Sequence, residues 1–244
     1  MNIPKTVDYS IYEEPLYWDN KETDTPGYGE WEHWPEIAAL FESVLRIETL
    51  LDIGCGAGHL VSCNPNFLGI DISRFAPTVS KVPSRIVNGG AANLPWTHNA
   101  FDCVFSGSTI EHIPPSKLDQ SLKEIFRVTK KYVILSLPTL DAYHGMKDGR
   151  ETMREIEFEG GDIPNSFSEC ERYQISRGHW HIKSKSWWIK KLSEYGNFDE
   201  DAKHRLLDFT SKVIPVTDSA WTANDPGLFV LTKPQCPTGD GRSK

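Results

Sequence analysis

Short apolar runs and amphipathic stretches alternate along the chain from residue 36 onward. The runs at 50–53, 66–71 and 227–232 are too short for typical helices and predict buried strands. Residues 36–45 are predicted to form a helix, because a proline precedes them and apolar side chains at 37, 40, 41, 44 and 45 share one helical face. A second helix is predicted over 184–196, from a capping serine to a terminating glycine. Strands alternating with helices indicate an α/β fold.

The first predicted strand runs into a glycine-rich turn, Asp52-Ile53-Gly54-Cys55-Gly56-Ala57-Gly58. Glycine has no Cβ and tolerates positive φ, so the backbone can turn tightly beneath a ligand. In the dinucleotide-binding fingerprint the third glycine follows the second by three positions, and here that position is His59. The carboxylate of Asp52 also suits a cation better than a pyrophosphate. The turn therefore favours a cationic cofactor over NAD, with an ordinary strand-to-helix turn as the alternative.

A second acidic residue ends the next predicted strand. Asp71 lies nineteen residues beyond Asp52, close to the offset of about 20 residues expected of a ribose-binding carboxylate. A carboxylate in that place can accept hydrogen bonds from two hydroxyls at once. Asp71 is therefore predicted to bind the ribose of a nucleoside cofactor.

The glycine turn and its acidic residue resemble motif I of the class I S-adenosylmethionine-dependent methyltransferases, and in particular the methyltransferase type 11-like family. Further segments follow in the order of that family: 89–96 resemble its adenine loop, 100–106 its fourth strand, 110–113 the segment after that strand, 124–131 its next helix and 132–138 its fifth strand. The resemblance covers residues 47–139. It implies a Rossmann-like three-layer sandwich with a mostly parallel seven-stranded sheet and S-adenosylmethionine as the cofactor.

The resemblance also implies which residues contact the cofactor. The acidic residue of the motif lies near the methionine part in this family. Many relatives place another acidic residue against the adenine amino group, but this chain has Gly90 there, so main chain, water or a neighbour such as Asn93 must replace that contact. The implied set is Tyr28, Asp52, Gly54, Cys55, Gly56, Gly58, Asp71, Ile72, Gly90, Ala91, Asn93 and Ser106.

Two segments outside the cofactor motifs are expected to cover the site. Residues 1–34 are rich in aromatic and acidic side chains and are expected to form an ordered cap, in which Tyr28 resembles part of the aromatic segment that closes over the cofactor in many relatives. Packing of these aromatics onto the sheet is the alternative. Residues 140–182 are an insertion after the fifth strand, and ligands of open α/β folds bind at the carboxyl ends of the strands, so this insertion is expected to be a substrate lid. One methyltransferase domain over 1–234 and a disordered tail over 235–244 are expected.

Four histidines are candidates for a general base. Methyl transfer from a sulfonium is an in-line displacement, so placement of the acceptor supplies much of the rate, and a base is needed only for an acceptor with a proton of high pKa. His112 follows the fourth strand, whereas His144, His179 and His181 lie in the predicted lid, and a structural role is the alternative for each. No metal site is predicted, because no carboxylate or cysteine accompanies the His179-x-His181 pair at close spacing.

Composition limits the classes of methyl acceptor and the cellular compartments that are expected. The formal net charge is −8 and the basic residues are dispersed, which disfavours a long polyanionic substrate. The five cysteines are scattered and are predicted to be reduced thiols. The chain shows neither a leader pattern nor an apolar run approaching about 20 residues, so a cytoplasmic enzyme without membrane contact is expected.

The sequence thus predicts methyl transfer from S-adenosylmethionine to an oxygen or nitrogen of a small-molecule or sugar-like metabolite. A protein or RNA methyltransferase is one alternative, although the acidic balance of the chain speaks against it. A noncatalytic S-adenosylmethionine-binding or regulatory subunit is another, suggested by Gly90. The acceptor and the oligomeric state do not follow from the sequence.

Overall fold

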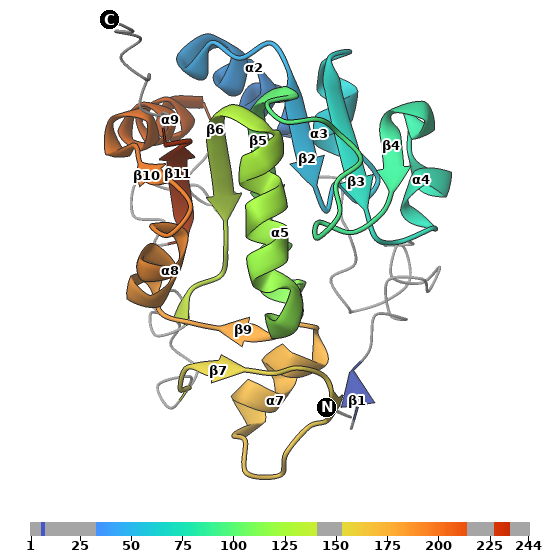
Figure 1. The fold of residues 1–244 in the computed structure, drawn as a ribbon, viewed down its shortest axis with the longest axis vertical. Helices are drawn as coiled ribbons and strands as arrows, with labels where there is room; N and C mark the ends of the chain where they lie inside the picture. Colours follow the sequence, from blue (N-terminus) through green and yellow to red (C-terminus); the bar gives the residue numbers. More distant parts are fainter. Residues whose placement is uncertain (1–5, 8–32, 141–152, 214–226, 235–244) are drawn as a thin grey trace, which may run out of the picture.

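A seven-stranded sheet organises the chain in the computed structural model, which describes residues 6–7, 33–140, 153–213 and 227–234 (Figure 1). The strand order is β10-β11-β6-β5-β2-β3-β4. These strands span Leu50–Ile53 (β2), Phe67–Asp71 (β3), Ile86–Asn88 (β4), Phe101–Gly107 (β5), Thr129–Ser136 (β6), Asn197–Phe198 (β10) and Leu228–Thr232 (β11). The five strands β6, β5, β2, β3 and β4 pair in parallel with one another. Strand β11 runs antiparallel to β6, and β10 runs antiparallel to β11. The predicted mostly parallel seven-stranded sheet is confirmed.

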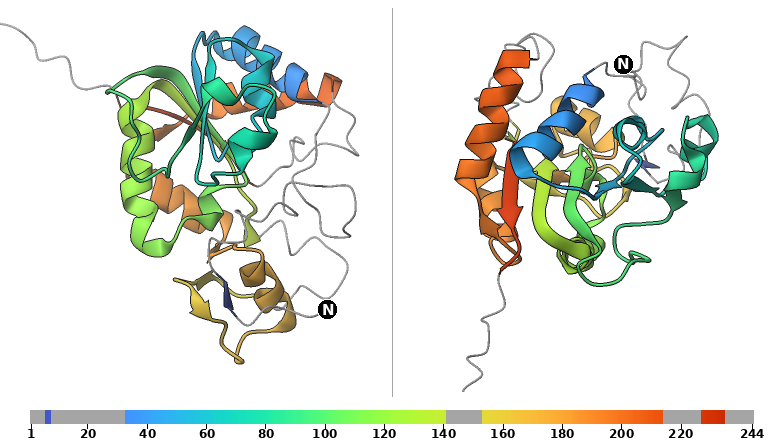
Figure 2. Two further views of the ribbon diagram at one scale, coloured as in Figure 1. Left: turned by 90° about the vertical axis from the view of Figure 1, so that its right-hand side faces the viewer. Right: turned by 90° about the horizontal axis from the view of Figure 1, so that it is seen from above.

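Helices cover both faces of this sheet (Figures 1 and 2). The helices labelled in Figure 1 are α2 (Trp34–Leu45), α3 (His59–Cys63), α4 (Ala76–Val79), α5 (Pro115–Val128), α7 (Glu169–Ser176), α8 (Lys185–Leu192) and α9 (Glu200–Val213). Of these, α7 packs in a buried cluster apart from the faces of the sheet. Two 3-10 turns are η2 (Pro83–Arg85) and η3 (Ile110–His112). One buried cluster joins α2 and α9 to the sheet, and a second joins α5 and α8 to its other face. Alternate strand residues divide between the two clusters, as Leu228 and Phe229 do. The three-layer sandwich is therefore confirmed.

Most predicted element positions agree with the structure. The helix predicted over 36–45 begins slightly earlier, at Trp34, with a proline in its first turn. Ser184 caps α8 by accepting from the backbone N–H of Trp187 at 3.3 Å. Strand β11 lies where the closing strand was predicted.

The boundary between the helix and the strand near residue 130 differs from the prediction. Residues up to 131 were assigned to the helix, but α5 ends at Val128 and β6 begins at Thr129. Thr129 pairs with Phe101 of β5, and its hydroxyl donates to the carbonyl of Ile125 at 2.7 Å. The β-branched threonine thus closes the helix and opens the strand in one residue.

The segment after β6 forms a small separate layer beyond the carboxyl ends of the parallel strands (Figure 1). It contains α7 and the short strands β7 (Ile156–Glu157), β8 (Gly161–Asp162) and β9 (His181–Ile182). Strands β7 and β9 pair, and β8 pairs with β1 (Thr6–Val7) from the start of the chain. A buried cluster of its own includes Ile175, Trp180 and Ile182. This placement is the one that the lid prediction requires, and the lid function stays a prediction.

Two further expectations concern the described ranges only. Cys55, Cys63, Cys103 and Cys170 are free thiols there. Within the same ranges, none of the helices combines the length and the apolar character needed to cross a bilayer.

Candidate functional site

The predicted glycine turn lies at the carboxyl end of β2, where the chain leaves the sheet for α3. Gly54, Gly56 and Gly58 have φ values of +72°, +51° and +74°, in the left-handed region that glycine adopts readily. The backbone N–H groups of Gly54 and Cys55 both donate to the carbonyl of Ile70, at 2.8 and 3.2 Å. These bonds hold the turn against the end of β3.

Packing beneath the turn also requires glycine. A Cβ on Gly54 would lie 2.1 Å from Thr109 Oγ1, and a Cβ on Gly58 would lie 2.7 Å from Ile86 Cδ1. Thr109 belongs to the loop between β5 and η3. The missing side chain of Gly54 therefore allows the glycine turn and this loop to touch.

Asp71 holds the turn as well as ending β3. Its Oδ2 accepts from the backbone N–H of Gly56 at 2.8 Å, and its Oδ1 accepts from that of Ser73 at 2.8 Å. The sequence predicted only a ribose contact, because the hydrogen bond to Gly56 arises from the approach of two neighbouring strands. Carboxylate oxygens accept more than one hydrogen bond each, so this structural role is compatible with the predicted ribose contact.

Asp52 is buried close to a second carboxylate, an environment that disfavours a negative charge on its side chain. Only 5% of its surface is exposed. Burial, and then the nearby charge of Asp71, raise the pKa of Asp52 to about 8. Without a counter-charge this carboxyl is therefore largely protonated at neutral pH, and a cation brought close to it would favour the ionised form.

Two residues of the predicted cofactor set turn their side chains into the protein. Cys55 packs with Val61 and Ile86. Ser106 is fully buried, and its hydroxyl donates to the carbonyl of Ile53 at 3.1 Å, which ties β5 to β2. A contact between Cys55 and the cofactor would therefore come from its backbone. The hydroxyl of Ser106 is already hydrogen-bonded within the sheet.

The predicted adenine side is open. Nothing in the described ranges lies within 4 Å of a Cβ built on Gly90. The backbone N–H of Asn93 donates to the carbonyl of Gly90 at 3.2 Å, which curls the loop, and Ala91 is half-buried beside it. Ile72, directly after Asp71, leaves 47% of its surface exposed. An apolar side chain and unfilled space thus adjoin the predicted ribose carboxylate.

The structure brings His112 and His179 together. Their rings meet edge to face with centroids 4.8 Å apart. His112 Nδ1 donates to the carbonyl of Gly178 at 2.9 Å, which fixes the proton on that nitrogen and leaves Nε2 as an acceptor. Each histidine is predicted separately from the sequence as a candidate base, and the two lie far apart in the sequence. The inserted segment, which contains His179, brings the two rings into contact.

Burial keeps these rings neutral. It lowers the pKa of His112 to about 4, and it lowers that of His179 to about 3 with a further contribution from His112. His181 is likewise lowered to about 4 by burial. All three imidazoles are therefore unprotonated at neutral pH, which is the state that a general base or a metal ligand needs.

His181 does not join the pair. Its Nε2 donates to the carbonyl of Ile113 at 2.9 Å, and its ring packs near Trp188 with centroids 5.8 Å apart. It secures β9 to the segment after η3. The other predicted residues, Tyr28 and His144, lie outside the described residues.

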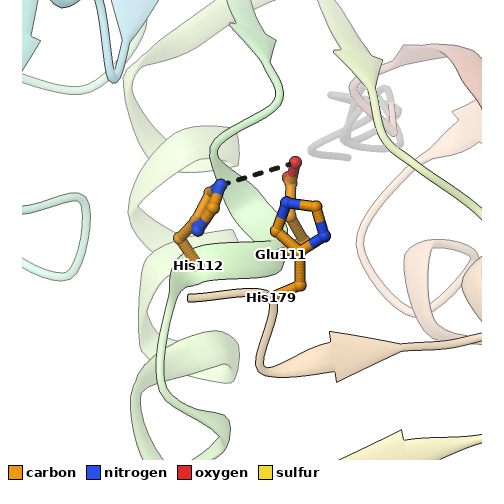
Figure 3. Close-up of side chains that lie close together, drawn as sticks. All are labelled: Glu111, His112 and His179. Atoms are coloured by element: carbon orange, nitrogen blue, oxygen red, sulfur yellow. Dashed lines mark ion pairs between the residues drawn. The ribbon is translucent and has the colours of Figure 1, made fainter. Parts of the chain in front are cut away.

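Sequence reasoning missed Glu111 as a site residue. Its side chain is fully buried, and burial raises its pKa to about 8. Glu111 Oε1 lies 3.8 Å from His112 Nε2 (Figure 3). The adjacent Glu-His pair was visible in the sequence, but only the fold shows that the carboxyl group faces the candidate base.

Comparisons with known proteins agree on the fold and diverge on the acceptor. Residues 51–137 match the family model of a methyltransferase domain. A tRNA (carboxymethyluridine(34)-5-O)-methyltransferase of Arabidopsis thaliana is 31% identical over 101 residues, which are 40% of this chain and 25% of that protein. A demethylmenaquinone methyltransferase of Symbiobacterium thermophilum is 28% identical over 118 residues, 42% of this chain and 46% of that protein. The chain thus spans less than half the length of these relatives.

One solved structure has a similar fold over most of the chain. The PH0226 protein of Pyrococcus horikoshii has a TM-score of 0.50 at 19% identity, covering 79% of this chain and 92% of that protein. At this identity the likeness concerns the fold alone.

Proposed function

The chain carries a methyltransferase domain of the class I S-adenosylmethionine-dependent type, and from this premise we propose that it methylates an oxygen or nitrogen of a small metabolite. The observation that carries the proposal is the glycine turn at the end of β2, held by Asp71 with the buried Asp52 beside it. This arrangement offers an approachable backbone and an acidic group for which the described residues show no counter-charge. A cofactor that is both a nucleoside and a cation matches these two features.

The residues at and around the glycine turn would each contact a different part of S-adenosylmethionine. Asp71 would accept from the ribose hydroxyls, and the exposed side chain of Ile72 and the open space at Gly90 would take the adenine. Asp52 would face the positively charged methionine part, where a cation would favour its ionised form. When bound, the cofactor supplies an electrophilic methyl group on a sulfonium.

The acceptor side is formed by η3 and the inserted segment beyond the carboxyl ends of the strands. The neutral ring of His112 presents Nε2 as an acceptor there, because Nδ1 is committed to the carbonyl of Gly178. A hydroxyl or amine acceptor could give its proton to this nitrogen. The inserted layer would exclude water and fix the acceptor, which is the larger contribution to the rate.

The methyl acceptor of this chain cannot be inferred from the curated relatives. One is named as a tRNA (carboxymethyluridine(34)-5-O)-methyltransferase and the other as a demethylmenaquinone methyltransferase, and the matches cover only 40% and 42% of this chain. The net charge of −8 favours a small acceptor over a polyanion. Transfer to tRNA is nevertheless the second candidate, because the relative with 31% identity is a tRNA methyltransferase.

Calorimetric titration with S-adenosylmethionine, S-adenosylhomocysteine and NAD tests the cofactor first. Transfer of radiolabelled methyl is then measured in parallel to a small-molecule metabolite extract and to total tRNA. Asp71→Asn, which keeps the size of the side chain, serves as the cofactor-site control in both assays.

The outcomes separate the candidates. Binding of both S-adenosyl compounds, with label in the small-molecule fraction, supports the proposal, and label in tRNA selects the second candidate. Binding without transfer to any fraction would favour the noncatalytic alternative. Failure to bind either S-adenosyl compound would refute the cofactor assignment.

A further inference from the structure

Three potential metal ligands converge between η3 and the inserted segment. Glu111, His112 and His179 each offer one ligand atom, and these atoms all lie within 4.8 Å of one another (Figure 3). Glu111 and His112 come from η3, whereas His179 lies just before β9. The fold therefore joins an adjacent carboxylate and imidazole to a second imidazole that is distant in the sequence.

The orientation of His112 is that of a metal-binding histidine. Its Nδ1 donates to the carbonyl of Gly178 at 2.9 Å, so Nε2 carries the lone pair, and this atom lies 3.8 Å from Glu111 Oε1. Metal-ligating histidines commonly donate their other ring nitrogen to a carbonyl or carboxylate, which fixes the tautomer. Here that outer contact is already in place.

Glu111 supplies a second, independent observation. It is fully buried, and neither carboxyl oxygen has a hydrogen-bond partner in the described part of the chain. Its Oε1 lies 3.8 Å from His112 Nε2, which is too far for the two atoms to share a proton in a hydrogen bond. A buried carboxyl group left without a partner is costly, and it faces the lone pair of a neutral ring.

We propose that Glu111, His112 and His179 bind a divalent first-row transition-metal ion of the Zn²⁺ class. Bonds of about 2.0–2.2 Å in a tetrahedral site place ligand atoms roughly 3.4 Å apart, so the observed separations need only small side-chain rotations. Two histidines and one carboxylate with remaining open positions form a recognised ligand set for such ions. His112 and His179 are half-buried, which gives the ion a route in.

The guanidinium of Arg177 is a competing positive charge that acts on both rings. Its positive charge opposes a bound cation, and the carboxylate of Glu111 offsets it. The proposed site differs from the expectation of no metal, which considered only the His179-x-His181 pair. His181 is engaged with the carbonyl of Ile113, and the ligands that accompany His179 come from η3 instead.

Metal binding can be measured without the proposed methyl transfer, since neither the cofactor nor an acceptor is needed for it. The two roles of His112 exclude each other in one molecule, because Nε2 cannot both coordinate an ion and accept a proton. A direct metal titration therefore also decides whether His112 is available as a base.

The test uses the full chain without a histidine tag, freed of metal with a chelator and dialysed. Calorimetric titration with Zn²⁺ is performed on the wild type, Glu111→Gln, His179→Ala and His204→Ala. Glu111→Gln keeps the shape of the buried side chain, and His204 is an exposed histidine on α9 that serves as the matched control. The visible spectrum of the Co²⁺-loaded wild type reports the ligands even if one variant does not fold.

We expect one Zn²⁺ per chain in the wild type and in His204→Ala, with affinity at least about tenfold weaker in Glu111→Gln and His179→Ala. Zn²⁺ should raise the thermal midpoint of the wild type but not of those two variants. The Co²⁺ spectrum should show the bands of a four- or five-coordinate site with nitrogen and oxygen ligands. Absence of binding to the wild type, binding that is undiminished in both variants, or a thiolate spectrum would overturn the proposal.

Discussion

Replacing Asp52 with Asn should stabilise the ligand-free protein more at pH 8 than at pH 5. Burial and the charge of Asp71 raise the pKa of Asp52 to about 8, whereas in the unfolded chain an aspartate titrates near about 3.9. Between these values the folded protein holds a proton that the unfolded chain has lost. The free energy of unfolding therefore falls as pH rises through this window, and an asparagine has no such proton to lose.

The magnitude follows from the difference between the two pKa values. One unit corresponds to about 1.4 kcal/mol, so Asp52 should lower the free energy of unfolding by at most about 3.5 kcal/mol between pH 5 and pH 8. Typical domains have only about 5–15 kcal/mol in total. Glu111, with its pKa raised to about 8 by burial, acts in the same direction, whereas the lowered pKa of His112 acts in the opposite one. Only the difference between variant and wild type isolates Asp52.

The assay is urea unfolding, followed by circular dichroism, at pH 5 and pH 8. The control is Asp102→Asn, which makes the same chemical change in β5. Burial raises the pKa of Asp102, but hydrogen bonds from the backbone of Glu48 and Thr49 and from Lys130 outweigh it and lower the pKa. The stability that Asp102 contributes is present above the unfolded pKa and lost only as pH falls below it. Asp102→Asn should therefore be destabilised by the same amount at both pH values.

An equal difference between wild type and Asp52→Asn at pH 5 and pH 8 would refute this reasoning, because Asp52 would then be ionised in the folded state. The cofactor gives a second check. If the sulfonium of S-adenosylmethionine ionises Asp52, binding near pH 7 should release protons, seen as calorimetric heats that vary with the buffer. The asparagine variant should show no such variation.

Three further changes test other parts of the site. Asp71→Asn weakens the hydrogen bond from Gly56, and we expect calorimetry to show an affinity for S-adenosylmethionine reduced by about tenfold, or about 1.4 kcal/mol. Gly54→Ala places a Cβ at φ +72° and 2.1 Å from Thr109 Oγ1; urea unfolding should show a loss of roughly 2 kcal/mol or more, and adding Thr109→Gly should restore only the steric part. If His112 is the base, its pKa of about 4 predicts turnover that stays level from pH 8 down to about pH 5; a decline centred near pH 6.5 would contradict a buried, neutral ring.

The cofactor half of the fold was predictable because its signals are local. Three glycines must have positive φ if the chain is to turn at the end of β2, and all three do. Asp71 ends β3, and Asp52 is the last residue but one of β2, close to where the apolar pattern implied. The boundary at Thr129 was misplaced because the same residues suit the end of a helix and the start of a strand, and pairing with β5 decides between them.

The acceptor side was less predictable because tertiary contacts create it. The pairing of β1 with β8 joins the start of the chain to the inserted segment, and no local pattern encodes it. His112 and His179 were each identified as candidates, but nothing in their spacing showed that they meet. Glu111 was not among the predicted site residues because the sequence indicates a structural role for the Glu111-His112 pair, and only the fold shows the carboxyl group buried beside His112.

The loop between β5 and α5 connects the two halves of the site directly. Thr109 fills the space left by Gly54, and two residues later the carbonyl of Glu111 accepts from the backbone N–H of Trp180 at 2.8 Å. His112 follows at once, and its Nδ1 binds the inserted segment. The candidate acceptor groups are therefore positioned relative to the glycine turn through three or four consecutive residues, without passing through the sheet. A side chain added at Gly54 should for this reason displace His112 as well as the cofactor, whereas an equal change on the far side of the sheet should affect neither.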